Sequence, residues 1–218
     1  LHPQASSGVW CGWVEQAGVG TTYRYRITAE SGARFDKSDP VGTAHHLPPS
    51  IDSLVSDVSY EWDDTDWMAD RGSRNGLDAP MAIYEVHLGS WGRTMHEGQR
   101  FPNYRDLAVP LADHCLAHGF THVEFLPLME HPFYGSWGYQ STGYFAPTAR
   151  FGTPQDMMAM IDHLHQRGMG VILTYNSNPE SAKAVVADIV RDGGRAVALR
   201  LDVADTSSFV AFADGVRT

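Results

Sequence analysis

Trp137-Gly138-Tyr139-Gln140, then Gly143-Tyr144-Phe145-Ala146-Pro147 and Phe151-Gly152, form the stretch that decides the fold of this 218-residue chain. The stretch follows an apolar segment, 122–128, that is typical of a buried strand. In barrel folds, the loops that follow parallel strands bind ligands. Sugars present flat C–H faces and hydroxyl groups, which aromatic rings and an amide can contact. The same residues also suit a small aromatic core beneath a long loop, so both interpretations stay open at this point.

The segments around this loop alternate between strand and helix patterns. Strands are predicted at 81–88, 122–128 and 170–175, and helices at 104–118 and 154–167. Thr153 and Pro154 are typical of an N-cap and a first helical residue, and Gly168 is typical of a helix end. This order predicts β-α-β units with a parallel sheet.

Residues 1–80 do not show this alternation of strands and helices. Two strands, Gly8–Glu15 and Thr22–Ala29, flank Gly18-Val19-Gly20, so we expect them to pair as a hairpin. The second strand alternates, which places Tyr23, Tyr25 and Ile27 on one face. The sequence therefore predicts a small antiparallel region before the alternating elements.

Residues 56–80 collect turn formers and acidic residues around Trp62 and Trp67. We interpret this stretch as a linker whose aromatic side chains pack against another part of the chain. Its cluster Asp63, Asp64 and Asp66 is most simply a solvated acidic turn.

Charge and composition exclude several classes of partner. The formal charge is −10 and the isoelectric point is near 5.4, so nucleic acids and anionic membranes would repel this chain. No apolar run approaches the roughly 18 residues of a membrane span, and no basic stretch followed by an apolar one is visible near Leu1, so we expect neither a span nor a signal peptide in this sequence. The two cysteines, Cys11 and Cys115, lie far apart in sequence and show no metal-ligand spacing, so we expect no disulfide framework and a cytoplasmic location. Because the chain opens on Leu1 and soon enters a strand pattern, we also expect its true start to lie upstream.

The titratable residues give no independent catalytic or metal site. His163 and His165 are two positions apart on a helix, and His45-His46 lies outside the regular elements, so neither pair has the spacing of a zinc site. The acidic residues Glu85, Glu124 and Glu130 belong to strands or strand ends, and Glu85 shares a strand face with His87. An acid/base pair made from them is conceivable on spacing alone. We therefore expect no metal and no cofactor.

Successive segments of the chain resemble the signatures of the 1,4-α-glucan branching enzymes of glycoside hydrolase family 13. The segments are Tyr84–Trp91, Gly119–Glu124, Leu126–Gln140 and Gly143–Gly152. Upstream, Gly8-Val9-Trp10, Tyr23–Ile27 and Lys37–Pro40 resemble the latter part of the β-sandwich carbohydrate-binding module that precedes the barrel in these enzymes. The resemblance covers roughly residues 8–173.

This resemblance implies an α/β fold with a remnant β-sandwich at 1–55, a linker at 56–80 and the first three strands of a (β/α)8 barrel at 81–173. It implies that Tyr139 stacks on a glucose unit of glycogen or amylose, with Gln140 nearby and Trp137 in the same loop. The parent reaction moves an α-1,4-linked chain to a 6-hydroxyl, using two carboxyl groups set about 5 Å apart. Neither carboxyl group has a match here, so we assign no catalytic residue and expect α-glucan binding without branching.

The end of the chain departs from that family after Leu173. Residues 171–178, 181–194 and 195–203 resemble the second strand, following helix and third strand of a short-chain dehydrogenase/reductase of the 3-oxoacyl-carrier-protein reductase type. The residues 174–218 would then form a Rossmann-like β-α-β piece, with helices at 179–191 and 206–217. The resemblance implies NADP contacts for Asn176, Ser177, Asp202 and Val203. No glycine-rich phosphate loop precedes Val171 and no Tyr-x-x-x-Lys follows, so NADP belongs only to this alternative.

Four hypotheses about the function of the chain follow from these resemblances. The chain is an inactive α-glucan-binding part of a branching enzyme, an active glycosyltransferase, a nucleotide-binding reductase fragment, or a chimeric reading frame without a selected function. We expect an open parallel sheet of about four strands with helices on its outer side. Because three barrel strands cannot close, the open edges favour self-association.

Overall fold

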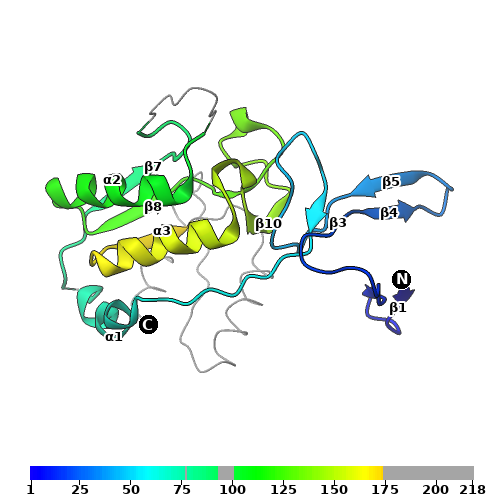
Figure 1. The fold of residues 1–218 in the computed structure, drawn as a ribbon, viewed down its shortest axis with the longest axis horizontal. Coiled ribbons are helices and arrows are strands. Elements are labelled where there is room, and N and C mark those ends of the chain that lie inside the picture. Colours follow the sequence, from blue (N-terminus) through cyan, green and yellow to red (C-terminus); the bar gives the residue numbers. More distant parts are fainter. Residues whose placement is uncertain (77, 93–100, 174–218) are drawn as a thin grey trace.

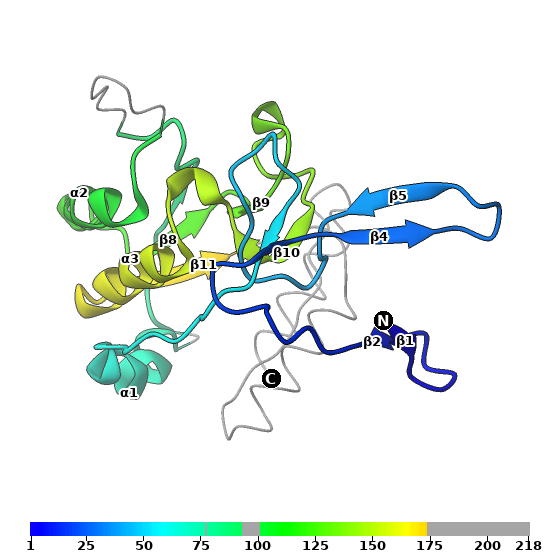
Figure 2. The same cartoon turned by 45° about the vertical axis from the view of Figure 1, so that its right-hand side comes forward.

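The computed structural model describes residues 1–76, 78–92 and 101–173 of the chain. A parallel sheet covered by helices occupies one side of the molecule, and short antiparallel strand pairs extend from the other (Figure 1). The long loop after strand β8 lies where these two parts meet (Figure 2).

The parallel sheet contains strands β7 (Ile83–Val86), β8 (His122–Phe125) and β11 (Gly170–Leu173), with β8 in the centre. Tyr84 is level with Val123, and Val123 is level with Val171. These are the three parallel strands that the sequence predicts, although β7 and β8 are shorter than expected. The fourth predicted strand, 195–203, and the end of the third, 174–175, lie outside the described residues.

Helices α2 (Tyr104–Ala117) and α3 (Pro154–Gln166) lie side by side over one face of this sheet (Figures 1 and 2). The side chain of Asn103 caps α2 by accepting from the backbone N–H of Arg105, at 2.8 Å. Thr153 and Asp156 form a capping box at the start of α3, with Pro154 as its first residue. Both predicted helices are confirmed, including α2 with its internal Pro110.

The core lies between these helices and the sheet. Its fully buried side chains interlock from both layers, and the largest are Tyr104, Phe125, Leu88, Leu111, Met160, Leu164 and Met169. The side chains of β7 and β8 that alternate with this face, Glu85 and Glu124, point to the opposite face. The apolar side chains of α2 and α3 therefore pack on the apolar face of the sheet, which is why the helices cover that face.

The antiparallel region pairs differently from the prediction. Its strands are β1 (His2–Pro3) with β2 (Trp10–Cys11), β3 (Thr22–Tyr23) with β6 (Ser53–Leu54), and β4 (Tyr25–Thr28) with β5 (Arg34–Lys37). The predicted hairpin between 8–15 and 22–29 is wrong. The turn that reverses the chain contains Gly32, whose φ of +82° suits glycine, so 25–28 pairs with the segment that follows it.

The predicted alternation is confirmed by contacts for Tyr23, Tyr25 and Arg26, whereas Ile27 is 51% exposed. Tyr23 and Tyr25 both donate to Asp39 Oδ2, at 2.7 and 3.3 Å, whereas Arg26 on the opposite face pairs with Asp36 at 2.8 Å. The β4–β5 hairpin projects away from the rest of the molecule (Figure 1).

The stretch 56–80 contains helix α1 (Thr65–Arg74), which the sequence did not predict. Trp67 is buried there and stacks on His165 of α3, with ring centroids 5.3 Å apart. Asp64 is also buried, and its Oδ2 lies 2.7 Å from His165 Nδ1. The expectation of a solvated acidic turn is therefore wrong for Asp64, because α3 supplies a partner that its own neighbourhood does not show.

The loop after β8 carries short elements of its own. These are β9 (Met129–Glu130), the 3-10 turn η1 (Tyr134–Ser136), β10 (Gly143–Pro147) and the 3-10 turn η2 (Ala149–Phe151). Strands β9 and β10 pair antiparallel with an irregular register. Within the described ranges, no helix combines the length and apolar character needed to cross a membrane.

Candidate functional site

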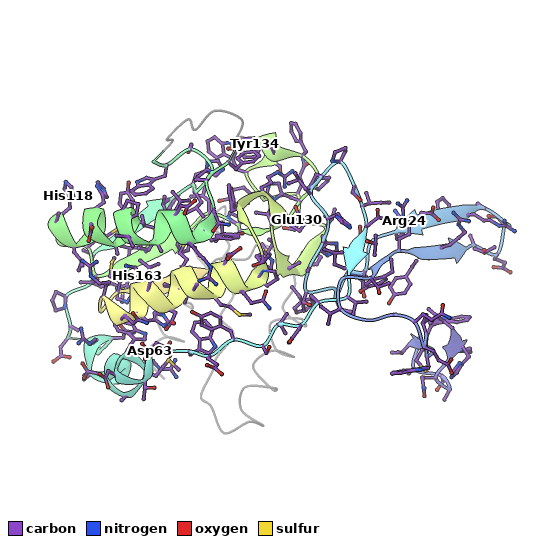
Figure 3. All side chains as sticks on the ribbon, viewed as in Figure 1. Arg24, Asp63, His118, Glu130, Tyr134 and His163 are labelled. Atoms are coloured by element: carbon purple, nitrogen blue, oxygen red, sulfur yellow. The ribbon has the colours of Figure 1, made fainter. Side chains whose placement is uncertain are left out.

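The loop 129–152 is tied at its base by a buried ion pair. Glu130 and Arg150 are almost completely buried, and Arg150 Nη1 lies 3.0 Å from Glu130 Oε1. Glu130 also accepts from the Ala149 backbone N–H at 2.7 Å and from Thr148 Oγ1 at 3.1 Å. Arg150 in turn donates to the His131 carbonyl at 2.7 Å. The carboxylate and the guanidinium thus join the two ends of the loop. Figure 3 labels Glu130, which lies in the loop region beside β10.

A tight turn inside the loop presents Trp137. Trp137 has a left-handed backbone with φ 54°, and its N–H donates to the Tyr134 carbonyl at 3.0 Å. Gly138 follows with φ +87°, and a Cβ at this position would collide with the Pro127 carbonyl. Only glycine therefore lets the turn approach the end of the sheet this closely.

The residues that follow strand β7 supply the surface under that turn. Trp137 stacks on His87 with centroids 5.2 Å apart and planes 28° apart, and His87 Nδ1 lies 2.8 Å from Ser90 Oγ. Tyr134 donates to the Gly89 carbonyl at 3.0 Å. The loop is therefore positioned by the residues that follow β7 as well as by its own base.

The predicted sugar-contacting residues are exposed. Trp137 and Tyr139 keep 54% and 55% of their surfaces open to solvent, and Gln140 is also exposed. A separate group of rings packs beneath the loop, where Phe101 lies 4.9 Å from Tyr134 and 5.6 Å from Phe151. The two interpretations of the loop thus describe different residues: a small aromatic core below, and open aromatic faces above.

A pair of carboxyl groups lies on the sheet face away from the helices. Glu85 and Glu124 are register partners on adjacent parallel strands. Burial, and then the charge of Glu85, raise the pKa of Glu124 above its ordinary value. The raised pKa favours the protonated form of the Glu124 carboxyl group.

Sequence reasoning missed the residues that build the site. Glu130 and Arg150 lie 20 positions apart, and no local pattern predicts that they pair. The strand pattern places His87 on the same face as Glu85 but does not predict its contact with Trp137. The spacing of Gly138 and Gly143 around the exposed rings was the available signal for a tight loop.

The remaining predicted positions divide into two groups. The residues assigned to a nucleotide lie outside the described part of the chain: Asn176, Ser177, Asp202 and Val203. The histidines excluded as metal ligands are described: His165 pairs with Asp64, and His45 Nδ1 lies 3.3 Å from Ser53 Oγ. Within residues 1–76, 78–92 and 101–173, no group of three or more His, Cys, Asp or Glu side chains could hold a metal ion.

Comparison with known proteins relates this chain to glucan-processing enzymes. The 1,4-alpha-glucan branching enzyme GlgB of Albidiferax ferrireducens is 55% identical over 170 residues, which cover 78% of this chain and 27% of the enzyme. The enzyme of the same name from Aquifex aeolicus is 52% identical over 169 residues, with 78% and 27% covered. No family model matches the chain.

Among solved structures, a Salmonella typhimurium protein provisionally assigned as an alpha amylase superposes with a TM-score of 0.53. It is 26% identical, and the match covers 69% of this chain and 23% of that one. These comparisons give no support to the short-chain dehydrogenase/reductase resemblance or to a chimera. Over about four-fifths of its length, the chain is therefore homologous to the 1,4-alpha-glucan branching enzymes, of which it spans about a quarter.

Proposed function

We propose that the chain binds α-glucans such as glycogen and amylose through Trp137, Tyr139 and Gln140, as the part of a 1,4-α-glucan branching enzyme that carries this loop. The observation that supports the proposal best is a pair of half-exposed aromatic side chains in a loop whose base is held by the buried Glu130–Arg150 pair. The homology to branching enzymes supplies the class of ligand.

Physical chemistry favours a neutral sugar chain on this surface. A glucose ring has a C–H face that gains by covering an aromatic ring, and its hydroxyl groups need donors and acceptors such as the Gln140 amide. Because His87 holds the indole of Trp137 from one side, less conformational freedom is lost when a sugar covers its outer side. The formal charge of −10 does not oppose a neutral ligand.

Branching requires more than this loop. Retaining transfer between glycosidic bonds needs a nucleophilic and an acid/base carboxyl group about 5 Å apart across the bond that is cut. None of the residues that resemble the family's signatures supplies this pair. We therefore propose glucan binding without branching activity for this chain, with residues 1–55 as the remnant of a carbohydrate-binding module.

The test is the retardation of the purified chain in native gels that contain amylose. Tyr139→Ala and Trp137→Ala should each weaken binding by about two- to twelvefold, if stacking on a sugar face is worth about the 0.5–1.5 kcal/mol that aromatic pairs gain beyond their buried area. Trp62→Ala is the matched control. Trp62 is similarly exposed, at 45%, but it packs on Tyr60 in the 56–64 stretch, at 4.9 Å between centroids.

Retardation that is equal in Tyr139→Ala, Trp137→Ala and the parent chain would contradict the proposed site. Formation of α-1,6 links from amylose by the purified chain would contradict the proposed lack of branching. The two results concern separate claims, so either part of the proposal can fail alone.

A further inference from the structure

Two histidines lie one helical turn apart at the end of α2. His114 is in the last turn of the helix, and His118 is its C-cap residue. Side chains four positions apart on a helix lie on the same face. The ring centroids of His114 and His118 are 4.4 Å apart, with planes tilted by 39°.

The hydrogen bond of His118 decides which of its nitrogens is free. Its Nδ1 lies 2.8 Å from the His114 carbonyl oxygen, and a carbonyl can only accept. Nδ1 therefore carries the proton, and Nε2 of the neutral ring holds a lone pair. Histidines that bind metals characteristically donate their other ring N–H in this way, which fixes the tautomer and the ring orientation.

His114 is held from its other side. Its ring lies 5.0 Å from Tyr84 and 5.9 Å from Trp91, centroid to centroid, and the side chain is half-buried. His118 is exposed, so solvent and ions can reach the pair. The His114 ring is thus fixed by packing and the His118 ring by a hydrogen bond. Both rings therefore lose little conformational entropy when they bind one ion.

We propose that His114 and His118 form a chelating site for a divalent transition-metal ion. An ion about 2.0–2.1 Å from a nitrogen of each ring is compatible with two rings at this separation. The carbonyl groups at the end of α2 carry partial negative charge, which also favours a cation. Two histidines four positions apart on one helix are a known way to hold zinc.

The neighbouring side chains indicate the character of the site. Cys115 is completely buried in the apolar core, so its thiol does not join the histidines at the surface. Asp113 is paired with Arg167 at 2.8 Å. Because the described residues offer no third ligand, water completes the coordination and the ion exchanges readily. The affinity follows the general order for nitrogen ligands, with Cu²⁺ above Ni²⁺.

The experiment is calorimetric titration of the whole chain with NiCl₂ at neutral pH. The parent for this series carries Cys11→Ser, because Cys11 Sγ lies 3.5 Å from His2 Nε2 and could bind the metal independently. His118→Gln should weaken Ni²⁺ binding at least tenfold, since even the loss of an outer-shell partner costs on the order of 10–100-fold in affinity. His114→Gln should have the same effect by removing the other ligand.

His46→Gln is the matched control. His46 is exposed and lies 2.9 Å from Thr22 Oγ1, far from α2 in the chain, so its replacement should leave Ni²⁺ affinity unchanged. Far-ultraviolet circular dichroism of each variant tests whether α2 remains folded. Equal Ni²⁺ affinity in folded His118→Gln and the parent would overturn the proposal, as would a loss that His46→Gln reproduces. The outcome is independent of α-glucan binding.

Discussion

The sheet-and-helix part of the molecule, 81–173, and the antiparallel part, 1–55, are stabilised by different forces. In the first, α2 and α3 bury a continuous apolar core against β7, β8 and β11. In the second, large apolar side chains remain open to solvent, with Trp13 at 88% exposure and Trp10 at 62%. The antiparallel strands are instead joined by a polar cluster around the buried Asp39.

This difference shows how the two parts resist unfolding. Burial of apolar surface stabilises the fold in proportion to the buried area, so each core side chain of the helix-covered sheet adds to the free energy of unfolding. Hydrogen bonds contribute less each, but a buried acceptor that loses its partners is costly. We expect the first part to tolerate polar changes at its surface and the second to depend on a few polar residues.

The largest effect is expected in the apolar core. Leu111 is a residue of α2 whose side chain is completely buried in the core. Leu111→Ala should lower the free energy of unfolding by about 2–5 kcal/mol, because it loses buried apolar surface and leaves a cavity. Urea unfolding of the two proteins measures this difference. Leu116→Ala on the same helix is the control, because Leu116 is 41% exposed and its truncation should change stability by less than about 0.5 kcal/mol. Equal effects would show that the core is not closely packed.

A smaller and local effect is expected at Asp39. Asp39 Oδ2 accepts from Tyr23 and Tyr25, and its Oδ1 accepts from the Val41 N–H at 2.9 Å. Burial, and then the hydrogen bond to Asp39, raise the pKa of Tyr23, which agrees with a hydroxyl that keeps its proton to donate. Asp39→Asn replaces charged acceptors by neutral ones and should cost about 1.5–3 kcal/mol.

Hydrogen exchange followed by mass spectrometry locates that loss. Faster exchange should appear in β3, β4 and β6, with little change in α2 or α3. Asp36→Asn is the control, since Asp36 pairs with Arg26 at the surface of the projecting hairpin and its loss should have much less effect. Faster exchange throughout α2 and α3 would mean that the two parts unfold as one unit.

The smallest effect is expected on the sheet face away from the helices, and it is stabilising. The raised pKa of Glu124 means that the folded chain holds this proton more tightly than the unfolded chain. The associated stability is present below the ordinary pKa of 4.5 and is lost as the pH rises through the raised value. At pH 7, Glu124→Gln should therefore raise the free energy of unfolding by about 0.2–1 kcal/mol, because burial first and the charge of Glu85 second both disfavour the Glu124 carboxylate.

Urea unfolding at pH 7 and pH 4 checks the sign of this effect. The advantage of Glu124→Gln should shrink at the lower pH, where the native carboxyl group is itself protonated. Glu85→Gln should give a smaller gain, because it removes the opposing charge but leaves the burial of Glu124. A loss of stability in Glu124→Gln at pH 7 would indicate that the carboxylate has a stabilising partner instead.

Much of the helix-covered sheet could be predicted from sequence because its signals are local. Thr153 and Pro154 marked the start of α3 through contacts within one turn, and the apolar spacing in 104–118 predicted α2. The exposed rings of Trp137 and Tyr139 were identified as candidate ligand contacts, whereas their support by His87 was not. Helix α1 was missed, because Trp67 and Asp64 find their partner only on α3.

The sequence by itself determined the order of β7, α2, β8, α3 and β11, the start of α3 at Thr153 and Pro154, and the opposite faces of Tyr25 and Arg26. Only the tertiary structure decided that β3 pairs with β6, that Glu130 meets Arg150, and that His87 lies under Trp137. The physical reason is distance along the chain. Caps and periodic patterns depend on neighbours within a few positions, whereas these contacts join residues whose meeting is settled only after the sheet and its helices have packed.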